Sequence, residues 1–287
     1  MEQELIEDPS GVDRRLGDLG FMSPANAPFN VFGATGVGPD LVPRGKWKSR
    51  SFANKPSFAP TTIKNQGSTN ECNAFAVCYA MEAVRRVNSA RDIALSPGFI
   101  YGNINNGNDN GSRLEDGLTH AQKVGTVPAT LVPELEWHRA RWPDNVFDVA
   151  KSFRALEWWL CPDFETMASA VHHGFPVIFG IAWGRSDQVD DEGWLPDEPA
   201  GGIAGGHAMC ALGLTKRSSG KKWGLLTVNS WGTKWGNEGW HVIPETRFAR
   251  NMFGGGAWAL RSVTLDDAEG AGIDITVGVV PSGEEDV

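Results

Sequence analysis

The chain has 287 residues, of which 41% are apolar, and its 12 tryptophans predict a substantial buried core. No apolar run reaches the roughly 18 residues that a membrane-spanning helix needs, so the sequence predicts no transmembrane segment. The net charge is −9, but residues 47–261 carry 21 acidic and 22 basic side chains, so the excess acidity lies at the two ends. A nearly neutral central block argues against nucleic acid as a ligand, since binding phosphates needs a basic surface.

The first 46 residues are rich in Gly, Pro, Asn and Asp, and we predict an extended N-terminal arm there. Residues 1–18 are acidic and polar and lack the basic start and apolar stretch of a secretory leader. We therefore expect a cytoplasmic protein, with association with a larger particle as the alternative.

The four cysteines of the chain form no CxxC pair and no cluster with histidine, so we expect free thiols and no zinc site.

The first predicted helix covers Cys72–Val87, and the capping residue types Ser68, Thr69 and Asn70 precede it. Its apolar side chains spread around the helix, which indicates burial on most sides. Two further helices are predicted over Arg113–Val124 and Asp163–His173.

Strands are predicted mainly in the second half of the chain, over Pro176–Trp183, His207–Leu214, Trp223–Asn229 and Gly239–Ile243. A loop with six acidic residues, Gly184–Gly206, follows the first of them. The predicted helices lie mostly before the predicted strands along the chain, and this order predicts an α+β protein of two lobes. The domain boundaries we expect are an arm over residues 1–46, a catalytic domain over 47–263 and an acidic tail over 264–287, in which residues 273–280 can add an edge strand.

Cys72 opens the first predicted helix, where free backbone N–H groups and the helix dipole favour a thiolate. A lone cysteine on an apolar helix is more often a buried packing residue, so its neighbours decide the interpretation. Gln66 precedes it by six residues, and a side-chain amide there can donate to a developing oxyanion together with the Cys72 backbone N–H.

A thiolate nucleophile needs a base, and His207 is the candidate because it follows two glycines at the start of a predicted strand. The other five histidines have no special neighbours, and we interpret them as core or surface residues. Asn229 ends the next strand and precedes two Trp-Gly pairs. This segment fits an aromatic packing turn, and it equally fits an amide that orients His207 with Trp231 shielding the hydrogen bond.

Together these segments resemble the papain family of cysteine peptidases, whose motifs appear in order at Gln66–Ser68, Cys72–Phe75, His207–Ala208 and Asn229–Gly239. His207 and Asn229 follow Cys72 by 135 and 157 residues, near the separations of about 130–150 already known for this family. The resemblance covers residues 47–263. It implies a papain-like fold, in which a helical lobe and a β-barrel-like lobe enclose the active-site cleft.

The activity that the resemblance implies is cleavage of peptides or proteins by an endopeptidase through a thioester acyl-enzyme, without metal or organic cofactor. In this scheme Cys72 is the nucleophile, His207 its base, Asn229 the orienting residue and Gln66 the oxyanion donor. The matching family positions place substrate next to Gly111, Ser112 and Trp231.

The sequence departs from the family pattern at the residue after the nucleophile, at both cysteines of a disulfide, and in the charge next to the nucleophile. Asn73 stands where the family has Trp or Tyr, and Thr69 and Asp109 stand where it has two disulfide-forming cysteines. Glu71 is expected to place a negative charge beside Cys72 and so to oppose thiolate formation modestly.

Two other functions stay open from the sequence. One is an assembly component, for example of a virus or phage particle, that retains a peptidase fold and binds a larger assembly through the arm. The other is an acyltransferase, since an acyl-enzyme can pass its acyl group to an amine instead of water. The acidic loop can select basic substrates, although such charge runs more often simply face water.

Overall fold

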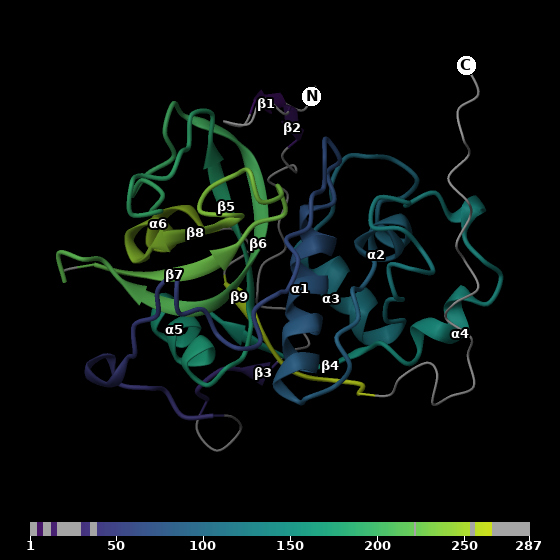
Figure 1. The fold of residues 1–287 in the computed structure, drawn as a ribbon, viewed down its shortest axis with the longest axis horizontal. Coiled ribbons are helices and arrows are strands. Elements are labelled where there is room, and N and C mark those ends of the chain that lie inside the picture. The colour runs from purple at the N-terminus through teal and green to yellow at the C-terminus, as the bar shows by residue number, and fades with distance from the viewer. Residues whose placement is uncertain are drawn as a thin grey trace.

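The computed structural model describes residues 5–7, 13–15, 30–34, 39–220, 222–252 and 256–265. Figure 1 shows helices gathered on one side of the molecule and a curved sheet on the other. The helical side contains α1 (Cys72–Val87), α2 (Pro97–Ile104), α3 (Leu114–Lys123) and α4 (Val146–Ala150). Two helices pack on the sheet, α5 (Phe164–His172) and α6 (Glu245–Asn251), and short 3-10 turns occupy Arg44–Lys46 and Arg139–Arg141.

In the described part of the chain, seven strands form one sheet in the order β3-β4-β9-β5-β6-β7-β8. Neighbours pair antiparallel except β3 and β4, which pair parallel. A separate two-stranded ribbon is made by β1 (Leu5–Glu7) and β2 (Asp13–Arg15). The sheet strands are β3 (Asn30–Val31), β4 (Ala155–Cys161), β5 (Val177–Gly184), β6 (Ile203–Lys216), β7 (Trp223–Val228), β8 (Trp240–Pro244) and β9 (Ala257–Val263).

Helix α1 is buried along nearly its whole length, from Cys72 to Arg85, as its spread of apolar side chains predicts. It packs against α2 and α3 on one side and against β6 and β9 on the other. The apolar core is divided into two clusters, one built around α1 and one inside the sheet lobe. Cys72 belongs to the first cluster and Trp231 to the second, so the candidate site lies where the two meet.

The α+β class and the three predicted helices are confirmed, with ends that differ by at most one residue from those expected. The predicted capping by residues 68–70 is wrong, because Glu71 is the N-cap of α1 and makes no side-chain cap bond. The sequence analysis missed α2, although Ser96 caps it and Pro97 opens it. It also missed β4 and β9, which complete the sheet; β4 precedes α5, so helices and strands are not segregated along the chain.

Several of the described residues of the predicted N-terminal arm contact the rest of the chain. Strand β3 pairs with β4, and Phe32 is 2% exposed within the cluster of the sheet lobe. The domain boundaries at residues 46 and 263 stay predictions, and the edge strand expected over 273–280 falls outside the described residues. No helix in the described ranges is long and apolar enough to span a membrane.

Candidate active site

Cys72 is the first residue of α1 and is only 6% exposed. Burial raises the pKa of its thiol, and the nearby backbone N–H of Ala208 partly offsets that rise. Since Ala208 follows His207 on β6, this proximity brings the candidate nucleophile next to the candidate base. Helix α1 also directs its free N-terminal amides at this position, which favours a thiolate.

His207 is 1% exposed, and its Nε2 lies 2.8 Å from Oδ1 of Asn229, the residue that follows β7. The same oxygen accepts the backbone N–H of Ser230 at 2.8 Å. Because Oδ1 acts as an acceptor, we infer that the neutral imidazole carries its proton on Nε2. Its Nδ1 is buried and has no hydrogen-bond partner within the described chain, so a lone pair is available there to take a proton.

Aromatic side chains surround the His207 imidazole. Trp231 stacks on it with ring centroids 4.7 Å apart, and Trp183 meets it edge-on at 5.2 Å. Burial lowers the pKa of His207 to about 4, and the nearby positive charge of Arg14 contributes to the lowering. The closed site therefore favours a neutral thiol and a neutral imidazole over an ion pair.

Gln66 is fully buried, and its amide is held at both ends. Oε1 accepts the hydroxyl of Ser230 at 2.6 Å, while Nε2 donates to the carbonyl of Thr69 at 2.7 Å. Nε2 carries a second N–H, for which the described chain supplies no hydrogen-bond partner. Ser230 thus connects Asn229 to Gln66, a link that the sequence analysis missed although Ser230 lies inside the motif it quoted.

Glu71 opposes a thiolate at Cys72, as expected, because its negative charge adds to the rise in the Cys72 pKa that burial mainly causes. Its side chain is fully buried, and burial, assisted by the charge of Asp109, raises its pKa to about 9. A carboxyl group with that pKa is protonated at neutral pH. At neutral pH this effect on Cys72 is therefore weakened, because burial keeps Glu71 mostly protonated.

The three predicted substrate-binding residues lie in two different environments. Gly111 and Ser112 are half-buried on the loop between α2 and α3, and Asn73 donates to the Ser112 hydroxyl at 3.1 Å. Asn73 therefore ties this loop to the residue after Cys72. Trp231 is only 2% exposed and contributes a wall behind His207. Substrate contact by all three residues stays a prediction.

Arg14, on β2, was not predicted as a site residue, because the arm offers no pattern that distinguishes it. It is 1% exposed and donates to the carbonyls of Gly67 and Trp231 at 2.9 and 3.1 Å and to Asn65 Oδ1 at 2.8 Å. Its guanidinium carbon also lies 5.6 Å from the Trp231 ring centroid. The β1–β2 ribbon is therefore anchored beside the candidate site, above the junction of helices and sheet in Figure 1.

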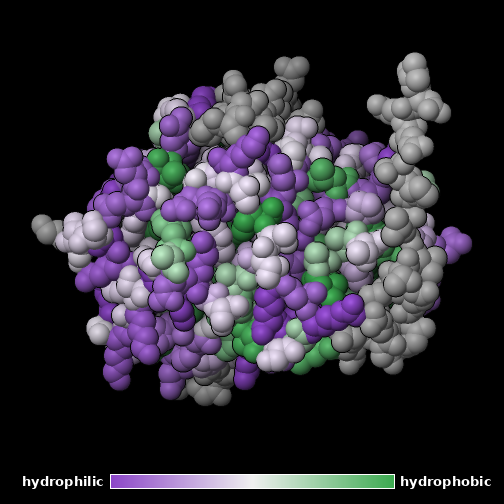
Figure 2. Space-filling model, viewed as in Figure 1, coloured by the Kyte–Doolittle hydropathy of each residue, from purple (hydrophilic) through white to green (hydrophobic). Residues whose placement is uncertain are grey.

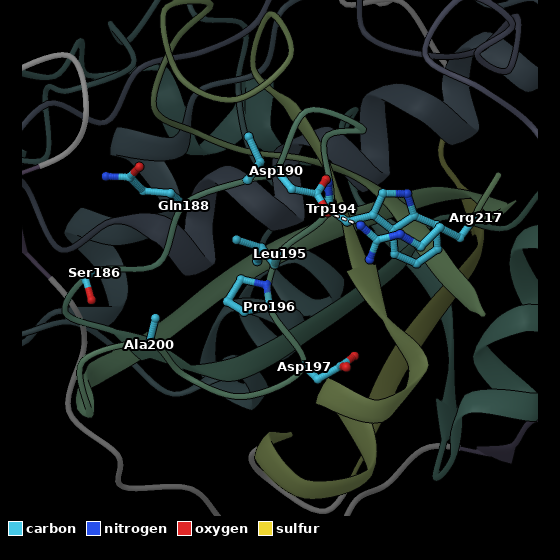
Figure 3. A pocket seen from close by; sticks show the side chains of 10 residues that line it. Ser186, Gln188, Asp190, Trp194, Leu195, Pro196, Asp197, Ala200 and Arg217 are labelled. Atoms are coloured by element: carbon cyan, nitrogen blue, oxygen red, sulfur yellow. Dashed lines mark hydrogen bonds and ion pairs between the residues drawn. The ribbon is translucent and has the colours of Figure 1, made fainter. Parts of the chain in front are cut away.

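The carboxylates of the acidic loop are mostly paired with cations of the same lobe. Asp187 and Arg247, both completely buried, form an ion pair at 2.5 Å, and Asp190 pairs with Arg217. Figure 3 shows this second pair at the rim of a pocket of about 490 Å³. Further pairs join Asp197 to Lys222 and Glu198 to Arg250. Because these charges are compensated locally, a structural role for the loop is better supported than selection of basic substrates.

No metal-binding group is evident in the described ranges, where no three His, Cys, Asp or Glu side chains cluster. The four cysteines are free thiols, and all of them are buried. Figure 2 shows hydrophilic side chains dispersed over the visible face, with small apolar patches between them.

Comparisons with known proteins agree on one family. A family model described as papain family cysteine protease matches residues 49–253. An uncharacterized peptidase C1-like protein of Acanthamoeba polyphaga mimivirus is 24% identical over 225 residues, 70% of each chain. A senescence-specific cysteine protease of Arabidopsis thaliana is 28% identical over 190 residues, which cover 65% of this chain but only 54% of that protein.

Solved structures show the same fold at low sequence identity. Xylellain, a cysteine protease from Xylella fastidiosa, matches with a TM-score of 0.63 and 18% identity, covering 87% of this chain and 98% of its own. The recombinant precursor of stem bromelain matches with a TM-score of 0.54 and 19% identity, covering 72% of this chain and 67% of its own.

Proposed function

Since the chain belongs to the papain family of cysteine proteases and has the papain-like α+β fold predicted from its sequence, we propose that it cleaves peptide bonds with Cys72, His207 and Asn229. The observation that carries this proposal is the 2.8 Å bond between His207 Nε2 and Asn229 Oδ1. That bond leaves Nδ1 as the proton acceptor on a histidine whose neighbour, Ala208, lies close enough to Cys72 for its backbone N–H to lower the pKa of the thiol.

The reaction begins when the Cys72 thiol gives its proton to His207 Nδ1 and the sulfur attacks the substrate carbonyl carbon. The carbonyl π electrons move to the oxygen, which receives N–H donors from Gln66 Nε2 and the Cys72 backbone. Collapse of this adduct breaks the C–N bond, and His207 gives its proton to the leaving amine. Water, deprotonated by His207, then attacks the thioester, which releases the carboxylic acid and returns the proton to Cys72.

Burial makes the first proton transfer unfavourable, because it raises the pKa of the thiol and lowers that of the imidazole. Three features of the site stabilise the resulting ion pair: the α1 dipole, the Ala208 N–H and the attraction between the thiolate and the imidazolium. The Asn229 amide also stabilises the imidazolium, because its Oδ1 accepts a hydrogen bond from the Nε2–H.

Incubation with a peptide library in ¹⁸O-labelled water tests the proposal, with products read by mass spectrometry and Cys72→Ala as the control. We expect internal cleavage and one ¹⁸O atom in each new carboxyl terminus, both lost in the control. Products joined to an added amine instead of water would indicate acyl transfer. Absence of any product from the unmodified chain would contradict the proposal and favour the assembly-component alternative.

A further inference from the structure

Asp109 connects two loops that carry candidate active-site residues. The nucleophile loop, residues 66–71, leads into α1, and the cleft loop, residues 105–113, connects α2 to α3. Asp109 Oδ1 accepts the backbone N–H of Asn70 at 2.8 Å, and the Asp109 carbonyl accepts Asn70 Nδ2 at 2.6 Å. Both bonds cross from one loop to the other.

The same carboxylate oxygen also fixes the part of the cleft loop next to the predicted substrate site. The hydroxyl of Tyr101, which is completely buried on α2, donates to Asp109 Oδ1 at 2.8 Å. That hydroxyl accepts the backbone N–H of Gly111 at 3.1 Å. Gly111 has a φ of +81°, which favours glycine, and the Tyr101 hydroxyl holds its N–H in this turn.

A second link lies on the other side of the nucleophile. Asn73 Nδ2 donates to the Arg113 carbonyl at 2.6 Å and to the Ser112 hydroxyl. Cys72 therefore lies between two residues, Asn70 and Asn73, that each bind the cleft loop. Bonds on both sides fix the sulfur relative to Gly111, where substrate is predicted to lie.

We propose that Asp109 is a positioning residue whose carboxyl group holds the nucleophile loop against the cleft loop, an arrangement that we call the clamp. The clamp takes the place of the disulfide of the papain family, whose two cysteines are Thr69 and Asp109 in this chain. The clamp aligns the substrate with Cys72, so this inference rests on the proposed function. A single side-chain oxygen of Asp109 receives one donor from each side, the Asn70 N–H and the Tyr101 hydroxyl, and so fixes the two loops relative to each other. Unlike a disulfide, the clamp is insensitive to reduction.

Amide hydrogen exchange tests the clamp itself and can be measured in Cys72→Ala, which prevents self-cleavage. In Asp109→Ala, the amides of Asn70 and Gly111 should both exchange at least about tenfold faster, because each loses its direct or relayed support. Tyr101→Phe removes only the relay, so Gly111 should exchange faster while Asn70 stays unchanged. The matched control is Asp116→Ala, which removes an exposed carboxylate on α3 and should change neither amide.

Kinetics with the full chain test whether the clamp positions substrate. Asp109→Ala should lower kcat/KM by roughly 10- to 100-fold, since a misplacement of about 1 Å can cost 100-fold. Asp109→Asn keeps an acceptor oxygen and should remain within about threefold of the unmodified chain. The Asp116→Ala control should match the unmodified chain.

An introduced disulfide supplies the final comparison. In Cys72→Ala, the substitutions Thr69→Cys and Asp109→Cys, with the bond verified by mass, should restore slow exchange at Asn70, and reduction should reverse this. Unchanged exchange at both amides in Asp109→Ala, or a verified disulfide without recovery at Asn70, would overturn the clamp. If the exchange results are as expected but the unmodified chain cleaves no peptide, the proposed function is contradicted and the clamp between the loops is not.

Discussion

Replacing Glu71 with glutamine should flatten the dependence of folding stability on pH. The pKa of Glu71 is raised from its ordinary value of 4.5 to about 9, mainly by burial. Between those two pH values the folded chain holds a proton that the unfolded chain has released. Stability contributed by this group is therefore complete below pH 4.5 and is lost as pH rises through about 9.

The size of the effect follows from that one proton. Within this window the free energy of unfolding should fall by roughly 1.4 kcal/mol per pH unit because of Glu71. From pH 4.5 to pH 7 the loss amounts to about 3 kcal/mol, a large share of the 5–15 kcal/mol typical of a folded domain. Glutamine cannot ionise, so Glu71→Gln should remove this slope.

The assay is urea unfolding at pH 5, 6, 7 and 8, with Cys72→Ala as the background of both chains. Glutamine brings its own buried N–H groups, which can shift absolute stability, so the comparison is between the two slopes. We expect the difference in unfolding free energy to grow in favour of Glu71→Gln with each pH unit. Parallel pH profiles for the two chains would refute the buried, protonated state of Glu71.

Three further predictions concern the candidate site. Ser230→Ala deprives Gln66 of its 2.6 Å bond and should lower kcat roughly tenfold, as measured with a fluorogenic peptide. Arg14→Ala removes a positive charge that lowers the pKa of His207, so the imidazolium should persist to higher pH and the lower limit of the pH–activity profile, where His207 must be neutral to act as a base, should rise. With limiting iodoacetamide and peptide mapping, Cys72 should label first, since it is 6% exposed and the other three cysteines are fully buried.

Matched controls separate these effects from general damage. Ser218→Ala, in an exposed turn, should leave kcat unchanged, and Arg250→Ala, at an exposed site on α6, should leave the pH profile unchanged. A Ser230→Ala chain as active as its control would contradict the role given to Ser230. An unshifted pH profile in Arg14→Ala would contradict the electrostatic link to His207. Faster labelling of any cysteine other than Cys72 would contradict its assignment as nucleophile.

Local sequence patterns were sufficient to predict α1, α3 and β5. The apolar run of α1, the acidic and basic ends of α3 and the short apolar run of β5 each express a periodicity or propensity within a few turns. The same holds for the motif segments, because residues 66–75 and 229–239 keep their spacing along the chain. Such features are local, so a single sequence reveals them.

Features that depend on contacts between distant residues could not be predicted. Strands β4 and β9 join the sheet through pairing between residues about 100 positions apart, such as Leu160 with Trp258. Nothing in the arm distinguished Arg14, which lies 217 residues from its partner Trp231. The raised pKa of Glu71 likewise follows from its burial, which its local sequence does not reveal.

By itself, the sequence determined the candidate residues Cys72, His207, Asn229 and Gln66 and the helix and strands that carry them. Tertiary structure alone decided how these residues meet: the His207 tautomer, the link from Ser230 to Gln66 and the clamp at Asp109. The physical reason is that residue type sets what a group can donate or accept. Which partner it finds, and whether water reaches it, depends on chain segments that only folding brings together.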